Sequence, residues 1–241
     1  MPNDYFQFQQ FRIEQAACAM KVSTDACVLG AAVDLAGATR LLDIGTGTGL
    51  LALMAAQRHP TVAIEAVEID SAAATQAATN ATVSPWGPRI QVRPMSLAAY
   101  AATRPAPFSH IVCNPPFFQG ALRSPSAART TARHAAPDTL TFTEISRFAA
   151  DFLVPSGYLT VLLPVTEMNL FTGEAAAAGL HPATRLTLCH RPGSRVLRHI
   201  VAFERTPGPL VEQALAIRSA DDDLVYTKTF QALLAGFYLA F

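Results

Sequence analysis

A strand-like run, a glycine-rich turn and an apolar helix follow one another without interruption at residues 41–59. The run LLDI leads through GTGTG into LLALMAAQRH. From there strand-like and helix-like segments alternate along the chain, with further strands expected at residues 62–69, 89–93, 108–113 and 157–164. Strands that alternate with helices form right-handed β-α-β units, so the sequence predicts an α/β fold whose mostly parallel sheet is covered by helices on both faces.

The two ends of the chain depart from this alternation. Phe6 and Phe8 lie at strand spacing and Phe11 follows after a one-residue slip, which predicts a short strand or hairpin that packs as core or as a lid. Residues 184–190 and 196–205 flank RPGS and predict a hairpin that adds an antiparallel strand. We therefore expect a Rossmann-like, doubly wound, mostly parallel seven-stranded sheet with an antiparallel C-terminal strand and a small N-terminal strand or hairpin extension.

Length and composition fit a single globular domain that spans residues 1–241. Hydrophobic residues make up 51% of the chain and charged residues 15%, which excludes a disordered protein. No run reaches the roughly 20 apolar residues of a membrane span, and the opening MPNDYFQFQQF lacks the features of a signal peptide. The four cysteines have neither zinc nor disulfide spacing. We therefore expect a cytoplasmic protein without metal or membrane contact, present as a monomer or weak dimer.

The glycine-rich turn is the strongest local signal for a ligand. Glycines 45, 47 and 49 alternate directly after the strand that contains Asp43, and glycine lets backbone amides approach a ligand closely. A nicotinamide or flavin site favours GxGxxG, but the third glycine of that pattern falls at Leu50. GxGxG with an acid two residues before it instead suits S-adenosylmethionine, whose ammonium and carboxylate Asp43 and the glycine amides would bind.

The second strand ends in AVEID, which places Glu68 about 20 residues after the glycine loop. This is the distance at which an acid meets a ribose in nucleotide-binding units, and two carboxylate oxygens match two vicinal hydroxyls. We expect Glu68 to bind the cofactor. Asp70 is expected to be structural, near the start of a helix that Ser71 caps.

The strand at residues 108–113 ends in the rigid sequence CNPPFFQG. Each proline restricts itself and the residue before it, so Asn114 and Pro115 are held extended with their carbonyls presented. The order of a glycine loop, an acid and then NPPF resembles the methyltransferases that modify exocyclic or amide nitrogens, whose shared tip is (N/D)PP(Y/F). Asn114 Oδ1 and the Pro115 carbonyl would each accept one N–H of the acceptor amine, and Phe117 would stack on the flat substrate.

The opening FQFQQFRIEQAACAMKVSTDACVLGA resembles that of the bacterial tRNA1(Val) adenine-37 N6-methyltransferases, and the likeness continues through LLDIGTGTGLLALMAAQR, AVEID, SPWGPRI, NPPFF and the final FYL. The resemblance implies N6-methylation of a tRNA adenine next to the anticodon, with S-adenosylmethionine as cofactor and residues 1–24 covering its site. It implies cofactor contacts at Lys21, Thr24, Asp43, Gly45, Gly47, Gly49, Glu68 and Asn114, and a catalytic tip at Asn114, Pro115, Pro116 and Phe117.

Ser96 is a departure from that family. Many members carry an acid after the third strand, where it meets the cofactor adenine, whereas Ser96 stands at about that position here. A serine hydroxyl still accepts a hydrogen bond from the adenine amino group, but more weakly than a carboxylate does. We keep Ser96 as an expected cofactor contact.

Arginines are unevenly distributed in this chain of zero net charge. No acid occurs between Asp70 and Asp138 or between Glu174 and Glu204, although both stretches contain several arginines. The clustering is either a chance feature of a solvated face or a basic surface suited to phosphates. We expect residues 120–139, a long connection without strand or helix signals, to form a substrate-side loop. The substrate-binding residues expected there and beside it are Phe117, Phe118, Arg123, Arg129 and Arg133.

Two other functions remain open on the residues alone. A protein glutamine N5-methyltransferase would use the same tip, because a side-chain amide is also a flat nitrogen acceptor. A non-catalytic RNA-binding protein with a residual cofactor site is the other possibility, although the intact Asp43, glycine loop, Glu68 and Asn114 argue against loss of the site.

Overall fold

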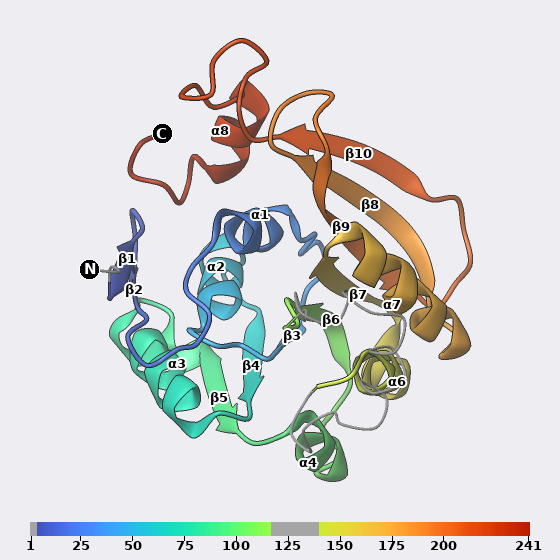
Figure 1. Cartoon of the computed structure of the whole chain (residues 1–241). Coiled ribbons are helices and arrows are strands. Elements are labelled where there is room, and N and C mark those ends of the chain that lie inside the picture. The colour runs from blue at the N-terminus through green and yellow to red at the C-terminus, as the bar shows by residue number, and fades with distance from the viewer. Residues whose placement is uncertain (1–3, 117–139) are drawn as a thin grey trace, which may run out of the picture.

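The computed structural model describes residues 4–116 and 140–241, in which one large sheet is covered by helices on both faces (Figure 1). The strands are β1 (Tyr5–Gln7), β2 (Arg12–Glu14), β3 (Arg40–Ile44), β4 (Ala63–Glu68), β5 (Ile90–Pro94), β6 (Phe108–Cys113), β7 (Leu153–Leu163), β8 (His181–Cys189), β9 (Val196–Glu204) and β10 (Val211–Ala216). The α-helices are α1 (Thr24–Ala32), α2 (Leu50–Arg58), α3 (Ser71–Val83), α4 (Leu97–Ala102), α6 (Phe142–Phe152), α7 (Val165–Ala177) and α8 (Lys228–Leu234).

The large sheet has the order β10-β8-β9-β7-β6-β3-β4-β5. In it β9 runs antiparallel to β7 and β8, while the other described pairs are parallel. The predicted fold class is confirmed, and so are the β8–β9 hairpin and the N-terminal hairpin of β1 and β2. The predicted number of strands was wrong: among the described residues the sheet has eight, because β10 adds an edge strand parallel to β8.

The sequence pattern hid β10 because an edge strand buries little of itself. Within VEQALA, Leu215 is the one buried side chain, so no apolar alternation marks the segment. Its pairing with β8 is supported by an ion pair between Arg185 and Glu212, 2.8 Å apart. The short helix α8 that follows was also not expected.

The order of the strands determines where a ligand can bind. The chain builds β3, β4 and β5 outward in one direction, and then returns to place β6 on the other side of β3. Such a reversal leaves a crevice outside the carboxyl ends of the two central strands. The loops that follow β3 and β6 meet there, and they are the glycine loop and the Asn114 tip.

The two faces of the sheet carry separate hydrophobic cores. On one face, buried residues of α1, α2 and α8 pack with Phe8, Phe11 and Ile13 of the N-terminal hairpin region. On the other, buried residues of α4, α6 and α7 surround Phe108, Phe171 and Phe203. This two-sided burial accounts for the near-continuous apolar runs of the central strands, such as FSHIVC, in which all six residues are buried.

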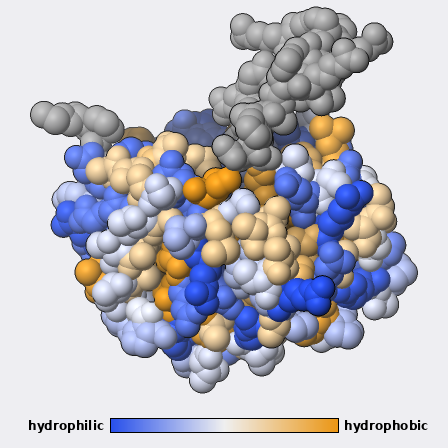
Figure 2. All heavy atoms as spheres, turned by 90° about the horizontal axis from the view of Figure 1, so that it is seen from below, coloured by the Kyte–Doolittle hydropathy of each residue, from blue (hydrophilic) through white to orange (hydrophobic). Residues whose placement is uncertain are grey.

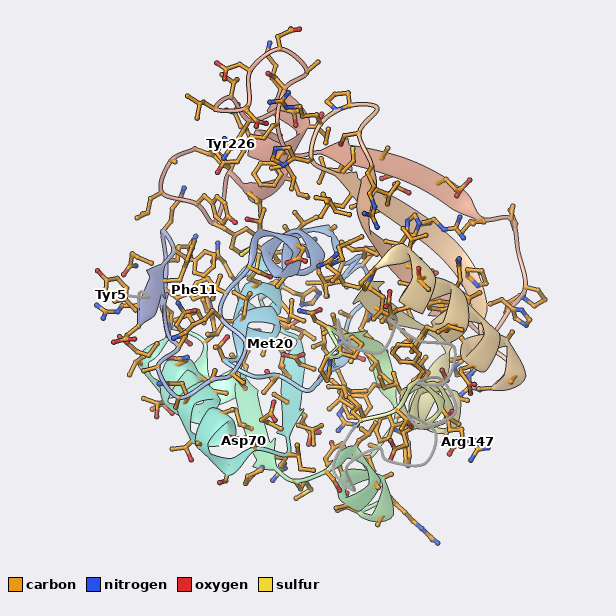
Figure 3. The ribbon with its side chains drawn as sticks, viewed as in Figure 1. Tyr5, Phe11, Met20, Asp70, Arg147 and Tyr226 are labelled. Carbon is orange, nitrogen blue, oxygen red and sulfur yellow. The ribbon has the colours of Figure 1, made fainter. Side chains whose placement is uncertain are left out.

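The N-terminal hairpin is held against the C-terminal end of the chain. The rings of Phe8 and Phe11 stack with centroids 4.5 Å apart, and Phe8 is fully buried. The side-chain amide of Gln9 donates to the carbonyls of Ala235 (2.9 Å) and Tyr238 (2.7 Å). These contacts confirm the core interpretation of the N-terminal phenylalanines, and Figure 3 shows Phe11 facing the body of the molecule.

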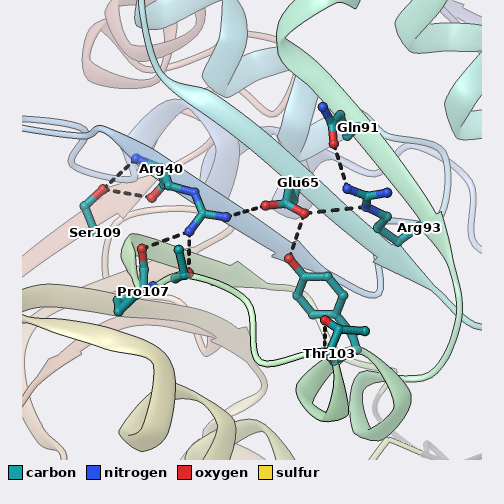
Figure 4. Close-up of polar contacts among 9 residues, drawn as sticks. Arg40, Glu65, Gln91, Arg93, Thr103, Pro107 and Ser109 are labelled. Carbon is teal, nitrogen blue, oxygen red and sulfur yellow. Dashed lines mark hydrogen bonds and ion pairs between the residues drawn. The ribbon is translucent and has the colours of Figure 1, made fainter.

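Several arginines of the acid-free stretches are held by ion pairs or hydrogen bonds to other parts of the chain. Arg93 and Arg40 both approach the carboxylate of Glu65, which also accepts the Tyr100 hydroxyl at 2.8 Å (Figure 4). Arg89 donates to three backbone carbonyls around the end of α2. In the second stretch, ion pairs join three of the four arginines to distant acids: Arg185 to Glu212, Arg191 to Asp223 and Arg198 to Asp25. Many of these charges therefore brace the structure rather than form an open basic face.

The described surface is mixed in character. On the face shown in Figure 2, hydrophilic and hydrophobic residues are intermingled. Among the helices that the structure describes, none is both long enough and apolar enough to cross a membrane. Within residues 4–116 and 140–241, no three histidine, cysteine, aspartate or glutamate side chains gather as a candidate metal site.

Candidate cofactor pocket and acceptor tip

The glycine loop (residues 45–49) joins β3 to α2 through left-handed backbone. Gly45, Gly47 and Gly49 have φ of 67°, 54° and 84°. A side chain is strained at each of these angles, which explains the alternation of glycines independently of any ligand. A Cβ added at Gly45 or Gly47 would meet no protein atom within 4 Å, whereas one at Gly49 would stand 3.5 Å from Ala77 of α3. The first two glycines thus face open space and the third faces a helix.

Asp43, near the end of β3, binds the glycine loop through the Thr46 side chain. It is fully buried, and its Oδ2 accepts the hydroxyl of Thr46 at 2.5 Å. Burial raises the pKa of Asp43 to about 7, against the weaker opposing effects of the Thr46 hydroxyl and the Ala52 amide. Its Oδ1 has no hydrogen-bond partner of normal geometry among the described residues. Asp43 is not among the residues that line the pocket described below.

Glu68 ends β4 and binds two backbone amides. Its Oε2 accepts the amide of Gly47 at 2.9 Å, and its Oε1 accepts that of Asp70 at 3.0 Å. Asp70 caps α3 by accepting the Ala73 amide at 2.8 Å, so the structural role expected for Asp70 is confirmed. The expectation that Ser71 is the cap was wrong, because Ser71 is already the first helical residue.

A pocket of about 500 Å³ opens between these elements at the carboxyl ends of β3 and β4. Five residues expected at the site line it: Gly45, Gly47, Glu68, Ser96 and Pro116. Most of the remaining lining is apolar, including Val67, Ile69, Ala73, Met95 and Leu97, and the acids Asp70 and Glu144 line the pocket as well. Its volume suits a nucleoside-sized ligand, its apolar side chains suit an aromatic base, and Glu68 offers hydroxyl acceptors. The residues present therefore fit S-adenosylmethionine.

Ser96 has a local role in addition to its place in the pocket. It is the N-cap of α4, where its Oγ accepts the amide of Ala99 at 3.1 Å. One lone pair and the hydroxyl proton remain for a ligand. Its proposed bond to the cofactor adenine stays a prediction.

Besides Asn114, which is described below, four residues expected to contact the cofactor do not line the pocket: Lys21, Thr24, Asp43 and Gly49. The ammonium of Lys21 donates to the carbonyl of Gln15 at 3.0 Å. Thr24 begins α1, and its side chain hydrogen-bonds the hydroxyl of Tyr238. Burial raises the pKa of Tyr238, and the bond with Thr24 opposes that rise. The amide of Gly49 donates to the carbonyl of Thr46 at 2.9 Å. In this structure these four residues support the pocket from outside it.

Asn114 follows β6 directly, at the topological reversal. Register pairs Cys113 with Ile44, so Asn114 comes next to the start of the glycine loop. Its Oδ1 is fully buried and has no hydrogen-bond partner among the described residues, although a buried amide oxygen normally has one. Pro116, two residues on, lines the pocket. The tip therefore presents an unused acceptor beside the cofactor pocket.

Comparisons with known proteins identify the family. The model described as "Methyltransferase small domain" matches residues 18–162. A protein named tRNA1(Val) (adenine(37)-N6)-methyltransferase from Dyadobacter fermentans is 40% identical over 99% of each chain. The protein of the same name from Serratia proteamaculans is 42% identical over 97% of this chain and 89% of its own. The chain belongs to the tRNA1(Val) (adenine(37)-N6)-methyltransferase family.

Solved structures of other methyltransferases share the fold of this family member. A predicted O-methyltransferase from Agrobacterium tumefaciens matches with a TM-score of 0.65 at 22% identity, over 88% of this chain and 96% of that one. The ribosomal protein L11 methylase of Lactobacillus delbrueckii subsp. bulgaricus matches with a TM-score of 0.57 at 16% identity, over 81% and 84% of the two chains. At these identities the likeness concerns the Rossmann-like fold alone.

The methyltransferase has a second side to its pocket that sequence reasoning described incompletely. Ala17, Cys18, Ala19 and Met20 line the pocket together with the glycine loop. They belong to the N-terminal segment (residues 15–22), which runs between the hairpin and α1 without regular secondary structure (Figures 1 and 3). The family-like motif around Cys18 and Lys21 signalled this segment, but it did not indicate which of its residues face the pocket.

The expected substrate residues cannot be placed in the same way. Phe117, Phe118, Arg123, Arg129 and Arg133 lie outside the described residues, as does the expected loop at residues 120–139. Their roles stay predictions.

Proposed function

We propose that this methyltransferase transfers a methyl group from S-adenosylmethionine to N6 of adenine 37 of tRNA1(Val). Relatives that carry this name match the chain over nearly its whole length. The observation that carries the proposal is the buried Oδ1 of Asn114 at the carboxyl end of β6, which has no hydrogen-bond partner within residues 4–116 and 140–241 and lies beside a nucleoside-sized pocket. An acceptor of this kind is costly to bury unless a ligand donor completes it.

Asn114 supplies what a poor nucleophile needs. The lone pair of an adenine amino group is delocalised into the ring, so the nitrogen reacts only when its hydrogens are held out of conjugation. Asn114 Oδ1 accepts one N–H and the Pro115 carbonyl accepts the other, which directs the lone pair toward the methyl donor. The cofactor supplies an electrophilic methyl group on a sulfonium. Transfer of that methyl group would form the N–C bond as the C–S bond breaks with its electron pair left on sulfur, and the nitrogen would then lose a proton to solvent.

We further propose two groups of cofactor residues. Gly45, Gly47, Glu68 and Ser96 contact S-adenosylmethionine directly, as their place on the pocket lining supports. Lys21, Thr24, Asp43 and Gly49 shape that lining from behind it, in keeping with their contacts within the protein. Residues 1–24 are proposed to cover the cofactor.

On the acceptor side, we propose that Phe117 stacks on the adenine and that residues 120–139, with Arg123, Arg129 and Arg133, face the RNA. Phe118 is assigned to the same surface. The sequence alone supports these roles. Because the substrate is a tRNA, we propose that the protein works in the cytoplasm.

The test is methyl transfer from labelled S-adenosylmethionine into transcripts of tRNA1(Val), followed by nucleoside analysis. We expect N6-methyladenosine in the transcript with adenine at position 37, and none in a matched transcript with guanine there. Label in protein that resists ribonuclease and yields to trypsin would instead indicate a glutamine side chain as the acceptor. RNA binding without cofactor binding would contradict catalysis altogether.

A further inference from the structure

One face of α3 contacts both sides of the cofactor pocket. Ala73, in its first turn, lines the pocket itself. One turn later, Gln76 Oε1 accepts the amide of Ala17 from the N-terminal segment at 3.2 Å. Ala77 packs against Gly49 of the glycine loop, and Asn80 completes this face. The helix thus lies between two chain segments that are far apart in sequence.

Asn80 is the residue that joins them. Its Nδ2 donates to the carbonyl of Thr48 in the glycine loop at 2.9 Å and to the carbonyl of Glu14 at 2.8 Å. Its Oδ1 accepts the amide of Glu14 at 3.0 Å. The side chain is fully buried, and these three bonds use both amide hydrogens and one oxygen lone pair.

These bonds hold the start of the N-terminal segment at a fixed distance from the glycine loop. Glu14 immediately precedes Gln15, whose side-chain oxygen accepts the amide of Val22 at 2.8 Å. This bond joins the first and last residues of the N-terminal segment. Residues 17–20 lie between those two points and line the pocket. The bonds of Asn80 to Thr48 and Glu14 therefore determine how far one side of the pocket stands from the other.

We propose that Asn80 is a positioning residue, which sets the separation of the N-terminal segment and the glycine loop and thereby the affinity for S-adenosylmethionine, without contact to the cofactor. The proposal rests on the proposed function for its ligand. A buried asparagine that served packing alone would be replaceable by an apolar side chain of similar size. One that positions two segments through three hydrogen bonds would not, because each lost bond leaves a buried backbone group unpaired.

The test compares Asn80→Leu, which preserves size, with Asn80→Ala. Thr79→Ala is the matched control, since Thr79 is exposed on the same helix and its hydroxyl donates to the carbonyl of Thr75, within α3 itself. We expect the KM for S-adenosylmethionine to rise roughly tenfold in both Asn80 variants while kcat at saturating cofactor stays within about twofold. Loss of folded protein would lower kcat and leave KM unchanged. A KM within about twofold of wild type in both Asn80 variants would overturn the proposal.

A second readout needs no cofactor. The chain has two lysines, Lys21 and Lys228, and both are exposed, so an amine-reactive reagent followed by mass spectrometry reports on the N-terminal segment with an internal reference. The bond from Lys21 to the Gln15 carbonyl depends on the position that Asn80 gives to Glu14 and Gln15. We expect the Lys21 to Lys228 labelling ratio to rise several-fold in Asn80→Leu and to be unchanged in Thr79→Ala. An unchanged ratio in Asn80→Leu would contradict the coupling.

The two readouts separate this proposal from the proposed function. If wild type transfers no methyl group, the function fails, and the labelling ratio still decides whether Asn80 couples the two segments. If neither Asn80 variant folds, hydrogen exchange on wild-type protein replaces them. Amides of residues 14–20 and of the glycine loop should then gain protection together as S-adenosylmethionine is added, and protection confined to the glycine loop would overturn the proposal.

Discussion

The glycine loop and the N-terminal segment line the same pocket, but different interactions hold each of them. The glycine loop connects consecutive elements, and its shape follows from three left-handed glycines and from Asp43 only a few residues away. The N-terminal segment has no regular structure. Gln76 of α3 bonds to Ala17 within the segment, and Asn80 of α3 bonds to Glu14 just before it. One side of the pocket is therefore encoded mainly locally, with added bonds from Glu68 to the Gly47 amide and from Asn80 to the Thr48 carbonyl, and the other depends on contacts between distant parts of the chain.

This difference has a consequence for function. A locally encoded loop keeps its shape whenever β3 and α2 form, so it is suited to a constant contact with the cofactor. A segment held by a few side-chain hydrogen bonds can be loosened without unfolding the core, because each such bond contributes only about 1 kcal/mol net. We infer that the N-terminal segment is the side of the pocket whose position sets how tightly the cofactor is held.

The largest effect on activity is expected at the acceptor tip around Asn114, which belongs to neither the glycine loop nor the N-terminal segment. Asn114→Ala should lower kcat by at least about 100-fold, because a preorganised acceptor for the amine is removed. Asn114→Asp, which keeps an acceptor oxygen, should retain far more activity. Stability should change little in Asn114→Ala, since the lost oxygen has no partner among the described residues. Single-turnover methyl transfer and thermal unfolding measure both, and equal activities of the two variants would contradict the role.

Gly47→Ala tests the locally encoded side. Its φ of 54° strains any side chain, and the new methyl group enters open space on the pocket lining. We expect the KM for S-adenosylmethionine to rise about tenfold and stability to fall by about 1 kcal/mol.

Gly193→Ala is the control for Gly47→Ala, because Gly193 has a φ of 74° and open space around it in the β8–β9 turn. It should lose similar stability with an unchanged KM. If both variants showed the same KM, the proposed contact of Gly47 with the cofactor would have to be abandoned.

Gln15→Ala tests the side held by tertiary contacts. Gln15 is buried, and its side chain accepts the Val22 amide, so its loss should cost about 1–3 kcal/mol and release the segment. We expect a KM for S-adenosylmethionine raised several-fold and a higher labelling of Lys21 relative to Lys228. Gln9→Ala, which disturbs the hairpin contact with the C-terminal end instead, should leave the labelling ratio as it is.

The smallest effect is expected to be a pH dependence of stability caused by the buried carboxyl of Asp43. The pKa of Asp43 is raised by burial from 3.8 to about 7, so the folded state binds a proton that the unfolded state has lost within that window. Stability contributed by the protonated form is therefore lost as pH rises toward 7. A neutral amide at this position carries no such cost, so Asp43→Asn should gain a few degrees in Tm relative to wild type at about pH 8 and less at about pH 5. A difference in Tm that is constant with pH would contradict the raised pKa.

Sequence patterns predicted most of the fold because its central elements are strongly apolar and consecutive. The strand at residues 108–113 was placed at its observed bounds, and the hairpin of β8 and β9 was expected from the turn between them. The eighth strand was missed since VEQALA buries little beyond Leu215, and the cap of α3 was assigned one residue late because Asp70 and Ser71 both cap helices well.

The candidate site was predictable where it depends on order along the chain. Gly45, Gly47, Glu68 and Ser96 follow strand ends of one parallel sheet, which must meet at one edge, and all four line the pocket. Lys21 and Thr24 were also expected to contact the cofactor, and neither lines the pocket: the ammonium of Lys21 donates to the carbonyl of Gln15, and the side chain of Thr24 hydrogen-bonds the hydroxyl of Tyr238. Motif position does not say which way a side chain points in a segment without regular structure.

By itself the sequence determined the alternation of strands and helices along the chain, the place of the glycine loop and the extended tip at Asn114, because these depend on the backbone preferences and apolar patterns of neighbouring residues. Only the tertiary structure decided that the Oδ1 of Asn114 is buried without a partner among the described residues and that Asn80 joins Glu14 to Thr48. Those facts depend on distances between residues far apart in the chain. A hydrogen bond between them forms only when the whole sheet and its helices bring the two atoms to within about 3 Å.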